Sequence, residues 1–389
     1  MEENILSRII DGLKYKVEKG SITYEQKKIS IIEELYTLNE DLACFLSQDK
    51  KNYLSLTSLG NSIATGYSGK DMIKPLLLRN ESLELVLKMN HINLETHSFA
   101  RAQDNCDEHI FNWLINNTLE NEINKMVHMD FGKEETSMLN PGLNEENLEK
   151  YYPMYSDNNK GLRDIIANND LDRANIVVYN GYTGSFLDNI TRKGKHFNLY
   201  GFKRDLISLE AVLKYIYLTS PNTQIYVVGV PNLLGINITQ LINKNLKRLC
   251  MLYPNITYVN GVAALHLIAK SDGKIAFDPH HTELEYLNLN KNIISSINKN
   301  YFKNKMFIEF DQVLKGYSNE GQFGNHDIRR DKALVSKLVT DLVGKYYKHI
   351  EQNDMKELLS FFKERYPHDY YYTDKKTIVD TIKKEGKEL

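Results

Sequence analysis

Apolar residues follow two different patterns along the chain, and together these patterns predict an α/β protein. Five short runs rich in Val, Ile, Leu and Tyr are typical of strands covered on both faces of a parallel sheet. They are NYLSLTSLG, HINLETHSFA, ANIVVYNG, TQIYVVGVP and NITYVNG, at residues 52–60, 91–100, 174–181, 223–231 and 255–261. Apolar residues spaced three and four apart predict helices over 206–221 and 236–254. Strands that alternate with helices indicate a doubly wound sheet.

The same patterns divide the chain into three parts. Residues 1–50 predict amphipathic helices that form an N-terminal extension. Residues 51–300 hold the α/β domain, which is interrupted at about 115–160 by a polar segment typical of a lid or a specificity element. Residues 301–389 predict a mainly helical C-terminal extension with one further strand, KMFIEF, at 305–310.

Composition narrows the classes of function. Of the 389 residues, 42% are hydrophobic and 26% are charged, which is enough apolar material for a core. A formal net charge of −2 gives no strong attraction to nucleic acid or to an anionic membrane. The three cysteines are far apart and form no C-x-x-C pair, so neither a disulfide framework nor a thiolate zinc site is expected. With no membrane-spanning run and no signal-peptide pattern, we expect a cytoplasmic protein.

Ser62 is the first candidate for chemistry. It follows the predicted first strand by two residues, after Gly60. The carboxyl edge of a parallel sheet is where open α/β sheets bind ligands, and the amides of a following helix would point at an oxyanion. Ser62 could therefore be a nucleophile. The alternative is that it only caps a helix, a position that serine favours.

Asp278 and His281 form the second candidate, because they lie three residues apart just before a predicted helix. A histidine there could reach a serine at a neighbouring strand end, and the aspartate could hold the imidazole, as in a Ser-His-Asp triad. The alternative is that Asp278 caps the helix and His281 lies on the surface.

The two candidates together resemble the SGNH, or GDSL, hydrolase family over residues 52–300. GNSIATG at 60–66 is similar to the family's first block, and DPHH at 278–281 is similar to its last. The resemblance implies a three-layer α/β/α sandwich with a flavodoxin-like parallel sheet of about five strands. It also implies that Ser62 is the nucleophile, that His281 is the general base, and that Asp278 orients His281.

The resemblance further implies an oxyanion hole. Its donors would be the Ser62 amide, an amide that follows the second strand, and a side chain that follows the third strand. The residues that match these places are Ser62, Ala102, Gln103, Asn180, Gly181 and Thr183.

This site would make the chain a serine hydrolase that cleaves an ester of a carbohydrate, lipid or small metabolite through an acyl-enzyme. No cofactor or metal is needed for that chemistry. Two alternatives are an acyltransferase with the same triad and a binding module that has lost efficient catalysis. The N-terminal helices could join two copies of the chain.

A metal-dependent phosphoesterase is a more remote alternative. It rests on GNHD at 324–327 and on the D-x-H of Asp278 and His280. The G-D-x-x-D and G-H-x-H motifs that would complete a two-metal site are absent from the sequence.

Overall fold

The structure is a computed structural model that describes part of the chain, and at a few positions it describes the backbone alone. The described residues are 22–66, 80–98, 100, 175–181, 209–210, 213, 216–217, 220–230, 237–251, 253–262, 266–269, 275–278, 280–319, 341–342 and 344–346. The chain forms two compact units, one of Met1–Lys247 with Tyr258–Asn298 and one of Arg248–Thr257 with Lys299–Leu389. The predicted three-part division stays a prediction, and the segment 115–160 lies outside the described residues.

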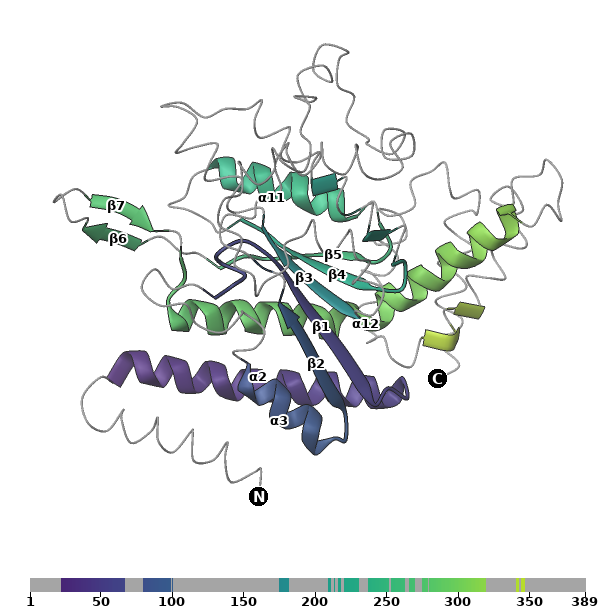
Figure 1. The fold of residues 1–389 in the computed structure, drawn as a ribbon, viewed down its shortest axis with the longest axis horizontal. Helices are drawn as coiled ribbons and strands as arrows, with labels where there is room; N and C mark the ends of the chain where they lie inside the picture. The colour runs from purple at the N-terminus through teal and green to yellow at the C-terminus, as the bar shows by residue number, and fades with distance from the viewer. Residues whose placement is uncertain are drawn as a thin grey trace, which may run out of the picture. The chain divides into compact units, whose positions relative to one another are not determined.

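A five-stranded sheet forms the centre of the α/β fold. Its strands are β1 (Tyr53–Gly60), β2 (Asn93–Ser98), β3 (Ile176–Asn180), β4 (Gln224–Val228) and β5 (Ile256–Val259), in the order β2-β1-β3-β4-β5 (Figure 1). β1 pairs in parallel with β2 and with β3, and β3 pairs in parallel with β4. This is the flavodoxin-like order of a doubly wound sheet. The five predicted strands and the predicted fold class are confirmed.

Helices cover both faces of the sheet, which explains why β3 and β4 are buried throughout. α11 (Asn237–Cys250) lies on one side, whereas α2 (Ile22–Gln48), α3 (Glu81–Met89) and the first part of α12 (Glu283–Asn319) lie on the other (Figure 1). All five residues of β3 and all five of β4 are buried. Residues that point to either face are therefore removed from water, and their burial supplies the main free-energy gain of folding.

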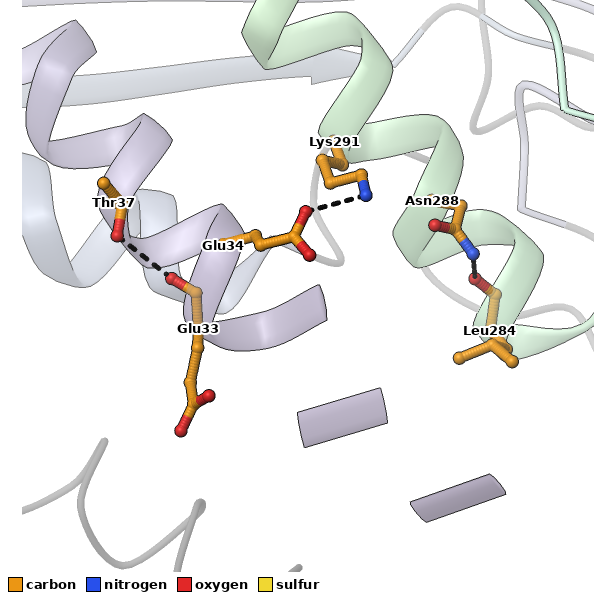
Figure 2. Close-up of polar contacts among 6 residues, drawn as sticks. All are labelled: Glu33, Glu34, Thr37, Leu284, Asn288 and Lys291. Atoms are coloured by element: carbon orange, nitrogen blue, oxygen red, sulfur yellow. Dashed lines mark hydrogen bonds and ion pairs between the residues drawn. The ribbon is translucent and has the colours of Figure 1, made fainter. Parts of the chain in front are cut away.

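The N-terminal extension packs against its own chain. α2 buries one stripe of its surface, which consists of Ile31, Leu35, Asn39, Leu42 and Leu46. Its contacts with α12 advance in the same direction along both helices, so the two run parallel. They are the ion pairs Lys28–Glu283 at 2.6 Å and Lys291–Glu34 at 2.7 Å, and the hydrogen bond from Asn298 Nδ2 to the Leu38 carbonyl at 2.7 Å. Figure 2 shows the Lys291–Glu34 pair between the two helices.

A buried amide cluster joins α2 to the start of α3. Asn39 Nδ2 donates to Asn80 Oδ1 at 3.1 Å and to Ser82 Oγ at 2.6 Å, and Asn80 Nδ2 donates back to Asn39 Oδ1 at 3.3 Å. Asn80 Oδ1 also accepts from the Leu83 amide at 3.2 Å, which makes Asn80 the N-cap of α3. The cluster fixes α2 relative to α3 without leaving these polar groups unpaired.

Two sequence expectations differ from the structure. The predicted strand at 305–310 is wrong, because these residues lie inside α12. An unbroken apolar run fits a buried helix as well as a buried strand, and Met306, Phe307, Ile308 and Phe310 are all buried. The antiparallel ribbon of β6 (His266–Ala269) and β7 (Ile275–Asp278) was not predicted. Among the described residues, no helix is long and apolar enough to cross a membrane.

Candidate active site

The candidate site begins at a tight turn where β1 ends. Gly60 has a φ of 134°, and a Cβ atom built on it would lie 2.2 Å from the carbonyl oxygen of Asn180 on β3. Only glycine permits both this backbone conformation and this close approach of two strands. The chain then forms a turn over residues 61–66, and Gly66 at its end has a φ of 80°. Residues 67–79, where the sequence could continue into a helix, lie outside the described residues.

Asn61 fastens this turn to the end of β3. Its backbone amide donates to the Asn180 carbonyl at 3.3 Å, and its side-chain Nδ2 donates to the Gly181 carbonyl at 3.1 Å. Its Oδ1 accepts from the Ile63 amide at 3.1 Å, which closes an Asx turn around Ser62. The Asn61 side chain thus donates to the end of β3 and accepts from the residue after Ser62, and these two hydrogen bonds fix the backbone on which Ser62 lies.

The structure brings Ser62 together with His280. Ser62 Oγ and His280 Nε2 lie 3.0 Å apart, and both residues are half-buried. The histidine expected there was His281, so the histidine in hydrogen-bond contact with Ser62 is one residue earlier than predicted. His281 is 2% exposed, and its ring packs edge-on against Tyr286, with centroids 5.1 Å apart. The separation of Ser62 and His280 is that of a nucleophile and its general base.

The start of α12 explains why the two histidines point to different places. Thr282 and Glu285 form a capping box, in which the Thr282 amide donates to Glu285 Oε2 at 2.7 Å and the Glu285 amide donates to Thr282 Oγ1 at 3.4 Å. His281 precedes the cap and packs on Tyr286 in the fifth place after it, as in a hydrophobic staple. The alternative of an Asp278 cap and a surface His281 is therefore wrong.

Two groups at the ends of β1 and β3 could donate hydrogen bonds to an oxyanion. Asn180, the last residue of β3, pairs in register with Gly60 and is 1% exposed. Neither Nδ2 nor Oδ1 of Asn180 has a hydrogen-bond partner in the part of the chain that the structure describes. A buried amide without a partner costs free energy and is unusual unless it has another role. The Ser62 amide likewise donates no hydrogen bond within the described residues.

The structure places the other predicted site residues only in part. Ala102, Gln103 and Thr183 lie outside the described residues, as do residues 324–327 of the remote metal alternative. Asp278 ends β7, two residues before His280, and only its backbone is described. Gly181 follows Asn180, and a Cβ atom there would lie 2.4 Å from the Tyr179 hydroxyl. Within the described ranges, no group of three or more His, Cys, Asp or Glu side chains could hold a metal ion.

Comparison with solved structures finds chains that match this one in part, at low similarity. One is described as a family two carbohydrate esterase from Clostridium thermocellum in complex with cellohexaose, with a TM-score of 0.35, 12% identity, and coverage of 64% of this chain and 65% of that one. Another is an acetyl xylan esterase, Est2A, from the rumen bacterium Butyrivibrio proteoclasticus, with a TM-score of 0.34, 13% identity and 64% coverage of each chain. The match thus spans less than two thirds of each of these chains.

Searches by sequence found no relatives. No protein-family model matches the chain, and no curated protein matches it. The case for the site therefore rests on its own geometry.

Sequence reasoning missed His280 and Tyr286. One sequence signal bears on the two histidines, since Thr282 and Glu285 have the T-x-x-E spacing of a capping box. That spacing places His281 next to the cap, where a ring packs inward, but it does not determine where His280 points.

Proposed function

We propose that this chain is a serine esterase, with Ser62 as nucleophile and His280 as general base, that acts on an acyl ester of a carbohydrate, lipid or small metabolite. The observation that carries the proposal is the 3.0 Å separation of Ser62 Oγ and His280 Nε2 at the carboxyl edge of the sheet. A base at hydrogen-bond distance from a hydroxyl makes serine reactive at neutral pH.

The chemistry follows from these two side chains. Ser62 Oγ attacks the ester carbonyl while its proton passes to His280 Nε2. The bond to the alkoxide then breaks, the alkoxide takes the proton from His280 and leaves as an alcohol, and the acyl group remains on Ser62 Oγ as the acyl-enzyme. Water attacks the acyl-enzyme, again with His280 as the base, and releases the acid and free Ser62. The half-buried positions of both groups leave them accessible to an ester.

The oxyanion of each tetrahedral intermediate needs donors that are not already used. Among the described residues, the Ser62 backbone amide and the buried side-chain amide of Asn180 are donors that we propose for this role. Of Asn180 and Thr183, we assign the side-chain donor to Asn180, and its unpartnered buried amide supports that choice. Each such donor is worth a factor of about a hundred to a thousand in rate.

The test is labelling by a fluorophosphonate, followed by intact-protein mass, on the wild type and on Ser62→Ala, His280→Ala and His281→Ala. We expect one label on the wild type and none on Ser62→Ala. Without its base, His280→Ala should label at least about a thousandfold more slowly. His97→Ala is a matched control, because His97 is also half-buried and pairs with Glu95 at 2.8 Å instead of with Ser62.

Three outcomes would contradict the proposal. The folded wild type could fail to label, which would favour a binding module. Ser62→Ala could keep the label, which would place the reactive group elsewhere. His281→Ala could abolish labelling while His280→Ala left it intact, which would return the role of base to His281.

A further inference from the structure

Tyr286 connects the two halves of the candidate site. Its side chain is fully buried, at 0% exposed, on the first turn of α12. Its hydroxyl donates to the carbonyl oxygen of Ile63 at 3.1 Å, which is the residue directly after Ser62. Its ring meets the ring of His281, which is the residue directly after His280, with an interplanar angle of 81°.

We propose that Tyr286 is a positioning residue that sets the distance between Ser62 and His280. The inference rests on the proposed function and adds to it a residue that does not touch the reacting atoms. One side chain contacts the backbone next to the nucleophile through a hydrogen bond and the side chain next to the base through a ring contact. The separation of the two therefore depends on a single rigid aromatic group.

The hydrogen bond acts on the turn that carries Ser62. The Ile63 carbonyl also accepts from the Gly66 amide at 3.0 Å, and Thr65 Oγ1 donates to the Ser62 carbonyl at 2.6 Å. These bonds hold the turn within itself. The hydrogen bond from the Tyr286 hydroxyl, by contrast, joins the turn to α12, the helix that begins just after His280.

The ring contact acts on the residues that carry His280. Since His281 precedes the Thr282 cap and Tyr286 lies on the first turn, their contact sets the angle at which the chain enters α12. His280 lies one residue further from the helix, so its position depends on that entry angle. A displacement of about 1 Å at a reacting pair costs on the order of a hundredfold in rate.

Tyr286→Phe is the sharpest test, because it removes the hydroxyl and keeps the ring on His281. The measurements are the maximal rate of fluorophosphonate labelling, the apparent affinity for the reagent, and the thermal unfolding midpoint. We expect the maximal rate to fall about tenfold, less than for a full 1 Å displacement because the ring contact remains. The apparent affinity should change less than about twofold, because Tyr286 is buried away from the reagent.

Tyr226→Phe is the matched control. Tyr226 is also fully buried, and its hydroxyl donates to Gln224 Oε1 on the same strand at 2.8 Å. Both variants lose one buried hydrogen bond, so a role in stability alone would lower both unfolding midpoints and neither labelling rate. If Tyr286→Phe does not fold, His281→Ala tests the ring contact instead and should lower the maximal rate about tenfold.

The outcomes separate this inference from the proposed function. A wild-type rate in Tyr286→Phe, with the wild type itself labelled at Ser62, overturns the positioning role and leaves the esterase proposal intact. Equal losses of rate in Tyr286→Phe and Tyr226→Phe also overturn it. If the wild type is not labelled at all, the proposed function fails and the positioning role fails with it.

Discussion

The close approach of β1 and β3 at Gly60 leads to a sharp prediction about Gly60→Ala. A Cβ atom there would lie 2.2 Å from the Asn180 carbonyl oxygen and 2.4 Å from its carbon, where ordinary contact begins at 3.4 Å. Both obstacles are backbone atoms of a buried strand, so neither can swing aside as a side chain would. The alanine must also adopt the φ of 134° or distort the turn.

The expected loss in the free energy of unfolding is the sum of two terms. A side chain at such a φ costs about 1–3 kcal/mol. Displacing the packed end of β3 costs about another 1–3 kcal/mol. Together they predict a loss of about 2–6 kcal/mol, which corresponds to a fall in the thermal unfolding midpoint on the order of 10 °C. Circular dichroism on heating measures that midpoint.

Gly229→Ala is the control for this prediction. A Cβ atom at Gly229 would lie 2.3 Å from the Tyr258 hydroxyl, so the obstacle is the end of a side chain, which can move. Its loss should be smaller, about 1 kcal/mol. The reasoning is refuted if Gly60→Ala unfolds at the wild-type temperature, or if the two variants lose equal stability.

Four further predictions concern the site and the residues that support it. Asn180→Ala should lower ester turnover about a hundredfold, yet change urea stability by less than about 1 kcal/mol, because it removes an unpaired buried amide. Asn39→Ala, by contrast, removes a side chain that is hydrogen-bonded and should lower the free energy of unfolding by about 2 kcal/mol. Asn61→Asp loses the donor to the Gly181 carbonyl and should cost about 1–3 kcal/mol in the same urea assay, with no loss contradicting the bond. Thr282→Ala removes the N-cap of α12 and should lower the urea stability by about 1 kcal/mol, and an unchanged midpoint would contradict the cap.

The candidate site was predictable in part. Ser62 could be found from its distance to Gly60 and its place after an apolar strand, because these features are local in the sequence. The choice between His280 and His281 could not be made in the same way, because it depends on which ring faces the helix and which faces β1. For the side-chain donor after the third strand, the sequence left Asn180 and Thr183 as alternatives. The burial of Asn180 in register with Gly60 is a property of the folded chain.

The sequence by itself determined where the five strands lie, because a near-continuous apolar run bounded by polar residues is stable only where both faces of a strand are covered. It also indicated the turn at Gly60, because glycine accepts a positive φ that other residues resist. Only the tertiary structure decided that residues 305–310 are helical and that His280 meets Ser62. The physical reason is that burial alone does not distinguish a strand from a helix, and that a choice between adjacent side chains is made by packing with residues more than two hundred positions away.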